Sequence, residues 1–236
     1  MIGIDFPKIE FQLFGLELLE PMALITNSML GLIALFFAHK TSKFKSKSPF
    51  YKYWKFFFFF FGIGVLLGGI GHTFYNQLGI YGKIQGWLLG PLTIYFAERA
   101  MVSVHWQPSK IKILNKLAIV KLIIVYTIFV ILLMVSSDSK LSTQPFLPIA
   151  INTIIGLIGF VGILGFKYTN KLSAKFNYFW FGVLVLMPTA LIFLLKINIH
   201  LWFDKNDFSH LIFCLGITYF YLGVNALDKG LKQKKQ

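Results

Sequence analysis

The sequence predicts an all-α integral membrane protein in which one domain, residues 1–236, forms a bundle of seven transmembrane helices. Three observations carry this prediction: the composition, the spacing of the apolar runs and the distribution of the lysines. Of the 236 residues, 56% are hydrophobic and only 14% are charged, and the mean hydropathy is +0.69. A single soluble domain of this length could not bury so much apolar surface. The composition therefore excludes a soluble enzyme, a disordered chain and a disulfide-stapled secreted domain.

The apolar residues gather in seven runs, each close to the roughly 20 residues that a transmembrane helix needs. In the second run, Gly62, Gly64, Gly68, Gly69 and Gly71 leave a smooth helix surface that a neighbouring helix can approach closely. The predicted spans are Pro21–Ala38, Trp54–Tyr75, Trp87–Val104, Leu117–Val135, Phe146–Phe166, Tyr178–Ile197 and Phe208–Val224.

The lysines indicate how these spans are oriented. The chain has 23 basic and 9 acidic residues, and sixteen lysines lie in alternate loops and in the basic tail at residues 227–236. Because cytoplasmic loops of membrane proteins collect Lys and Arg, we expect the N-terminus outside and the C-terminus inside. The net charge of +14 is thus explained by the orientation of the chain in the membrane and by attraction of its lysines to anionic lipids of the bilayer. We do not take it as a sign of nucleic-acid binding.

The first 20 residues precede the first predicted span. Apolar residues such as Phe6, Phe11 and Phe14 predict a short interfacial helix within residues 1–20. No basic segment precedes an apolar one there, so we do not expect a cleaved signal peptide. A plasma or inner membrane is the expected location, and an organelle membrane is left open. The sequence does not indicate the oligomeric state.

A few polar residues fall inside the predicted spans, where burial of charge is costly. Glu98 and Arg99 lie in the inner third of the third span, and we expect a structural ion pair or side chains that reach the interface. Lys121, near a span end, is expected to extend toward the interface in the same way. Asn27 and Asn152 are expected to hold neighbouring helices together.

The outer rim contains the side chains best suited to catalysis or metal binding. The predicted topology brings His72, His200 and His210 to one face at similar depth, with Asp204 and Asp207 beside them. Asp204 is a candidate general base and Asp207 a second candidate catalytic residue. The outer rim is therefore the predicted functional site.

The seventh span suggests a metal centre at this rim. Asp207 is predicted to be the N-cap of that helix, and it lies on the same face as His210, where it could orient the imidazole. Cys214 lies one turn beyond His210. Together with His72 and His200, these nitrogen and sulfur ligands suit Zn²⁺. The alternative is that the histidines are ordinary interfacial residues and that Cys214, which has no disulfide partner, fills the core.

These residues resemble the CREST superfamily, which includes the alkaline ceramidases and the progestin/adiponectin-type receptors. The resemblance rests on the seven-span arrangement, on His72 in the Gly-Ile-Gly-His-Thr-Phe stretch, and on His210 in the last span. It implies a zinc ion held by one histidine of the second span and two residues of the seventh. It also implies a lipid amide as substrate.

The sequence departs from the family pattern at three places. Cys214 stands where the second histidine of the seventh span is expected, and Gly68 stands where a serine is expected. No aspartate follows His72 at the expected position. If the resemblance is genuine, either Cys214 and His200 complete the metal site or catalysis has been lost.

Two functions follow as hypotheses. The first is a zinc-dependent membrane hydrolase that cleaves a lipid amide or ester at the outer rim, between spans two and seven. The second is a non-catalytic seven-helix protein that binds a lipid or another small ligand, as a receptor does. A transporter and a retinal-type pump are weaker alternatives, because the chain lacks paired broken helices and the seventh span lacks a lysine for a Schiff base.

Overall fold

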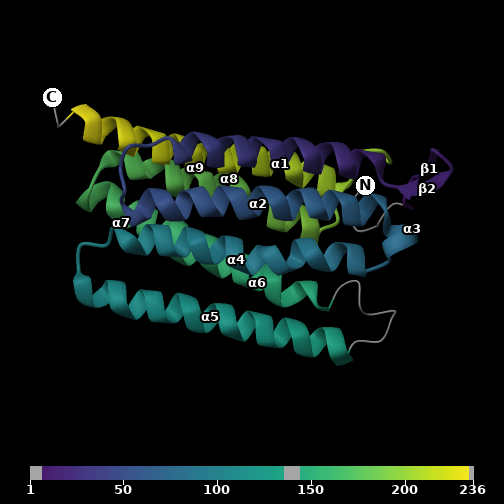
Figure 1. Ribbon diagram of the computed structural model, residues 1–236, viewed down its shortest axis with the longest axis horizontal. Coiled ribbons are helices and arrows are strands. Elements are labelled where there is room, and N and C mark those ends of the chain that lie inside the picture. Colours follow the sequence, from purple (N-terminus) through teal and green to yellow (C-terminus); the bar gives the residue numbers. More distant parts are fainter. Residues whose placement is uncertain (1–6, 136–143, 234–236) are drawn as a thin grey trace.

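The apolar runs fold into long antiparallel helices that lie side by side, as the computed structural model shows (Figure 1). The structure describes residues 7–135 and 144–233. The elements are β1 (Glu10–Leu13), β2 (Leu16–Leu19), α1 (Pro21–Ser42), α2 (Pro49–Thr73), α3 (Tyr75–Leu78), α4 (Tyr81–Ser103), α5 (Pro108–Val135), α6 (Phe146–Ile155), the π-helix η1 (Gly156–Ile163), α7 (Leu164–Lys171), the 3-10 helix η2 (Ala174–Phe176), α8 (Asn177–Leu194) and α9 (Lys205–Gln233).

Six helical segments in the described part of the chain are long and apolar enough to cross a membrane. They are Pro21–Ser42, Pro49–Thr73, Pro108–Val135, Phe146–Lys171, Ala174–Leu194 and Lys205–Asp228. The expected third span corresponds to α4, which has 23 residues but carries Lys83, Glu98 and Arg99. The prediction of a helical fold is therefore confirmed, and the six long apolar segments are consistent with an integral membrane protein.

The segment before α1 differs from its prediction. Residues 10–19 form an antiparallel hairpin in which Glu10 pairs with Leu19, and not an interfacial helix. Phe14 and Gly15 both have positive φ, at 52° and 78°, which is typical of the tight turn of a hairpin. Residues 1–6 of the predicted interfacial helix lie outside the described residues.

The C-terminal segment also differs from the expected solvated tail. Helix α9 continues without interruption to Gln233, and Asp228 is buried within it. The stretch from Ala226 to Gln233 contains mostly good helix formers and no proline, so the helix has no reason to end where the apolar run ends. Residues 234–236 lie outside the described part.

Glycines allow α2 to lie very close to α1 and α4, as expected from the second apolar run. A Cβ atom on Gly71 would lie 2.4 Å from the carbonyl oxygen of Gly82 in α4. A Cβ on Gly69 would lie 2.8 Å from Cβ of Asn27 in α1, and one on Gly62 would lie 2.9 Å from the carbonyl oxygen of Gly31. Close packing of this kind holds helices together in a bilayer, where lipid removes most of the hydrophobic driving force.

An aromatic cluster fills the bundle among α2, α8 and α9. Trp54, Phe58, Phe179 and Phe220 are all fully buried, and the rings of Trp54 and Phe179 stack with their centroids 5.1 Å apart. This packing contrasts with α5, which lies at the edge of the bundle in Figure 1 and leaves most of its apolar side chains exposed.

The contact between α2 and α4 predicts a position-specific cost of adding one methyl group. We expect Gly71→Ala to lower the free energy of unfolding by about 1–3 kcal/mol, because the new Cβ would overlap the Gly82 backbone. Gly159→Ala is the matched control, since a Cβ at Gly159 meets nothing within 4 Å. Thermal unfolding of the detergent-solubilised protein measures both, and equal stability of the two variants would contradict the prediction.

Candidate functional site

Three helix ends meet where the sequence predicted the functional site. The residue before α1, the last turn of α2 and the first turns of α9 contribute Glu20, His72 and His210 to one polar cluster. Lys8 reaches it from the segment before the hairpin, and Asp204 reaches it from the residue before α9. We call Lys8, Glu20, Thr26, His72, Asp204, Asp207 and His210 the outer cluster.

Glu20 is the centre of the first half of the outer cluster. Its Oε2 lies 2.8 Å from Nδ1 of His72, and its Oε1 pairs with the ammonium of Lys8. Burial by itself raises the pKa of Glu20. The hydrogen bond and charge of His72 and the charge of Lys8 outweigh burial and lower this pKa to about 2. Glu20 is therefore a carboxylate at any physiological pH.

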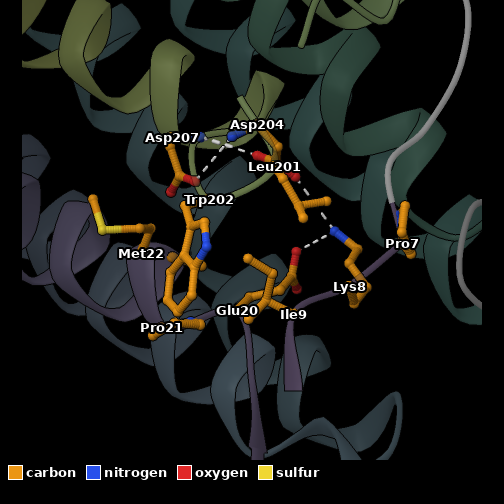
Figure 2. Close-up of a pocket in the computed structure, with 11 residues that line it drawn as sticks. Pro7, Lys8, Ile9, Glu20, Pro21, Met22, Leu201, Trp202, Asp204 and Asp207 are labelled. Carbon is orange, nitrogen blue, oxygen red and sulfur yellow. Dashed lines mark hydrogen bonds and ion pairs between the residues drawn. The ribbon is translucent and has the colours of Figure 1, made fainter. Parts of the chain in front are cut away.

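Lys8 links Glu20 to the start of α9. Its ammonium lies 3.4 Å from Oδ2 of Asp204, so it bridges two carboxylates, as Figure 2 shows. Burial lowers the pKa of Lys8, but the negative charges of Glu20 and Asp204 outweigh burial and raise it above its ordinary value. The chain before the hairpin is thus held onto the outer cluster by charge.

Thr26 organises the second half of the outer cluster. Its Oγ1 lies 2.8 Å from Oδ1 of Asp207, 2.9 Å from Nδ1 of His210 and 3.0 Å from the carbonyl oxygen of Met22. A hydroxyl has one proton to donate, and both the carboxylate and the carbonyl can only accept it. The hydroxyl can then accept from Nδ1–H of His210, which leaves Nε2 of that ring with its lone pair.

Asp204 and Asp207 cap α9 in a different way from the prediction. The helix begins at Lys205, so Asp204 and not Asp207 is the N-cap. Oδ1 of Asp204 accepts from the backbone N–H of Asn206 at 2.7 Å and of Asp207 at 3.3 Å. Oδ2 of Asp207 accepts in return from the N–H of Asp204 at 3.2 Å, which is the reciprocal pattern of a capping box. Asp207 and the His210 ring both contact the Thr26 hydroxyl, so Thr26 lies between the carboxylate and the imidazole, which the sequence predicted to meet directly.

The structure places His200 and Cys214 in other surroundings. His200 lies in the exposed turn after α8, where its Nδ1 accepts from the N–H of Trp202 at 3.1 Å. Cys214 is half-buried and packs against the hydrophobic core.

These positions decide how well the cluster fits a zinc ion. His72 and His210 fit, since each is bound through Nδ1, the arrangement that orients ligating imidazoles. A third ligand is missing: across residues 7–135 and 144–233, no three His, Cys, Asp or Glu side chains are placed to hold a metal together. The described residues therefore do not form a three-ligand site, and the zinc ion stays a prediction.

A small cavity of about 20 Å³ borders the outer cluster. Glu20, Asp204 and Asp207 line it, with Lys8 and Trp202, as Figure 2 shows. A volume of this size accommodates about one water molecule, and the carboxylates supply hydrogen-bond acceptors for it.

Three residues of the outer cluster were not predicted from the sequence. Lys8 and Glu20 were assigned only to the outer segment, and Thr26 was not singled out in the first span. The available signal was local: Glu20 directly precedes Pro21, which begins α1, and Thr26 lies between one and two turns into that helix. Their partners, however, come from residues that are distant in the sequence.

The depressed pKa of Glu20 predicts a pH dependence of stability. A carboxylate with a folded pKa of about 2 and an ordinary value of 4.5 stabilises the fold fully above pH 4.5, and this contribution is lost as the pH falls toward 2. We expect Glu20→Gln to lower the free energy of unfolding by about 1–3 kcal/mol at pH 6 and to flatten its decrease between pH 5 and 3. The exposed Glu17→Gln is the control, and a pH profile shared by Glu20→Gln and the parent chain would contradict the prediction.

Comparisons with known proteins place the chain in a family and go no further. Searches of curated proteins and of solved structures gave no match. A family model matches residues 22–229, from the first turn of α1 to the last turns of α9. The family has no known function, so the resemblance to the CREST superfamily stays a prediction. The chain belongs to DUF6962, a family of unknown function.

Proposed function

We propose that the chain crosses the membrane seven times, with the N-terminus outside and the C-terminus inside. Six segments are apolar enough to span, and α4 has the length of a span and packs among them. The hairpin and the outer cluster lie at one end of the bundle, and the α1–α2 and α4–α5 connections, rich in lysine, lie at the other (Figure 1). This separation supports the proposed orientation. The membrane is a plasma or inner membrane.

We propose that the outer cluster is the catalytic site of a membrane hydrolase that acts on a lipid amide or ester. One observation carries the proposal: His72 and His210 are each bound through Nδ1, which leaves both Nε2 atoms available for proton transfer. Glu20 holds one ring, and Thr26 with Asp207 holds the other. An imidazole fixed by a carboxylate is the usual form of a general base near neutral pH.

The chemistry that these residues supply is general-base hydrolysis. With Nδ1–H of His72 donated to Glu20, Nε2 takes a proton from a water molecule, and the oxygen of that water attacks the carbonyl carbon of the substrate. The C–N or C–O bond then breaks, and the leaving amine or alcohol takes the proton back from the imidazolium. Glu20 stabilises the charged ring throughout. Since the described residues provide only two well-placed zinc ligands, none of these steps uses a metal ion.

The hydrolase proposal predicts a loss of activity on substitution of either ring. Purified protein is incubated with a panel of lipid amides and esters, and product release is measured by mass spectrometry. We expect His72→Gln to reduce the rate by about 10²–10⁴-fold, the usual contribution of a general base, and His210→Gln to reduce it less, because His210 is not the base in this route. His39→Gln, an exposed histidine at the other end of α1, is the control. No hydrolysis of any substrate, or equal rates in all variants, would contradict the proposal.

A metal analysis of the same preparations tests the predicted zinc ion. Stoichiometric zinc that is lost in His72→Ala and His210→Ala would mean that these two rings recruit a further ligand outside the described arrangement. Activity that persists after chelation would support the metal-free route. Activity that is abolished by a chelator and restored by zinc would contradict that route and support the metal-dependent one.

A second candidate is a non-catalytic protein that binds a lipid or another small ligand at the outer cluster. It is supported by Cys214, which packs against the core, and by the lack of a three-ligand metal group among the described residues. Native mass spectrometry distinguishes the two functions. We expect a binding protein to retain a lipid that His72→Gln releases, without turnover, whereas a preparation that carries no lipid and cleaves one would contradict this candidate.

A further inference from the structure

A second group of ionisable residues lies inside the bundle, on helices that do not contribute to the outer cluster. Glu98 of α4 is fully buried, and its Oε1 lies 2.6 Å from Nζ of Lys121 on α5. The same ammonium donates a hydrogen bond to Oδ1 of Asn152 on α6, which is also buried. We call Glu98, Lys121 and Asn152 the inner triad. Lys121 thus turns into the bundle, although the sequence predicted that it would extend to the interface.

The inner triad leaves polar atoms without hydrogen bonds. Within the described part of the chain, Oε2 of Glu98 and Nδ2 of Asn152 are buried and have no hydrogen-bond partner. An unsatisfied carboxylate oxygen inside a bundle is costly, and the cost falls when the carboxylate takes up a proton. The unsatisfied oxygen of Glu98 therefore favours uptake of a proton by this carboxylate.

The backbone around Glu98 is built for close approach. Asn152 lies one turn before the π-helix η1, and π-helical segments are frequent at functional sites. A Cβ atom on Gly156, the first residue of η1, would lie 2.7 Å from Oε1 of Glu98 and 2.1 Å from Cγ2 of Ile94. Only glycine lets η1 lie this close to the carboxylate.

Helix α5 is attached to the bundle by the inner triad and by a small set of apolar side chains. Ala118, Val125 and Phe129 of this helix are buried, Ile111 and Leu114 are half-buried against the core, and most of its other apolar side chains are exposed. Besides the contacts of Lys121, Tyr126 donates a hydrogen bond to the carbonyl oxygen of Leu88, at 2.6 Å. A change of charge at Glu98 therefore acts on a helix that leaves most of its apolar side chains outside the bundle.

The other groups around Glu98 do not compensate its charge. Arg99, its neighbour on α4, points elsewhere and donates to the hydroxyls of Tyr95 and Tyr53, at 2.6 and 3.0 Å. Among the described residues, Lys121 is the charged group paired with Glu98; the polar side chains of α6 and η1 are Asn152 and Thr153, and the Thr153 hydroxyl donates to the carbonyl oxygen of Ile149 at 2.9 Å.

We propose that the inner triad is a proton-binding site that couples protonation of Glu98 to release of α5 from the bundle. With Glu98 ionised, the triad is neutral overall and Lys121 holds α5 against α4 and α6. When Glu98 takes a proton from water, an unpaired ammonium remains inside the bundle, which is costly. Lys121, whose side chain is 18% exposed, then turns outward, and α5 loosens.

Hydrogen exchange of α5 in the full-length protein, measured by mass spectrometry from pH 8 to pH 5 and corrected for intrinsic rates, tests this coupling. We expect exchange in residues 108–135 to rise by at least about 100-fold at the acidic end, the lower bound for breaking a buried pair. Glu98→Gln, which mimics the protonated acid, should exchange fast at every pH. Infrared difference spectra over the same range should show a protonated carboxyl band that Glu98→Gln lacks.

Two further variants make the outcome decisive. Lys116→Met removes an exposed lysine of the same helix and should keep the pH dependence of the parent chain. Lys121→Met removes the internal cation, so exchange of α5 should no longer change with pH. If Glu98→Gln does not fold, the pH dependence of α5 exchange in the parent chain and in Lys121→Met still tests the proposal. Exchange of α5 that does not change with pH in the parent chain, or that changes equally in Lys121→Met, would overturn the proposal.

Discussion

Close backbone contact between α2 and its two neighbours is the constraint on which the polar chemistry of this protein depends. In a bilayer the lipid chains are as apolar as the helix surfaces, so helices associate through packing and not through burial from water. Gly69 and Gly71 remove the side chains that would separate α2 from α1 and α4. His72 follows directly on this surface, and it reaches Glu20 only because the two helices lie so close.

The polar residues divide into two groups that share no helix. The outer cluster joins the start of α1, the end of α2 and the start of α9, whereas the inner triad joins α4, α5 and α6. The contact of α2 with α4 connects these two halves of the bundle. Polar groups that lipid cannot solvate are in this way collected where helices can satisfy one another.

The sequence predicts the helices well and their ends less well. Apolar runs identify each long helix because a bilayer demands about 20 apolar residues whatever the fold. The ends follow other rules: α2 begins at Pro49, five residues before its apolar run was placed, since Ser48 caps it. The hairpin depends on the turn at Phe14 and Gly15, whereas the apolar residues of the same segment led to the prediction of an interfacial helix.

The candidate site was likewise predicted only in part from the sequence. His72, His210, Asp204 and Asp207 could be predicted to lie at one rim, because topology alone brings helix ends together. Their partners could not be predicted, since Thr26 meets Asp207 and His210 across a sequence separation that no local pattern encodes. The same holds for Lys121, whose direction is set by where Glu98 and Asn152 lie after packing.

The π-helix η1 has a consequence for how this family can vary. A π turn contains more residues than an α turn, so each side chain after η1 is rotated relative to an uninterrupted α-helix. With the rotation that η1 sets, Tyr168 of α7 is fully buried, and its hydroxyl donates to the carbonyl oxygen of Met101 at 2.9 Å. Loss of a single residue between Gly156 and Ile163 would turn Tyr168 by about 100°. Relatives that keep this contact must therefore keep the length of the segment, even where its apolar residues exchange freely.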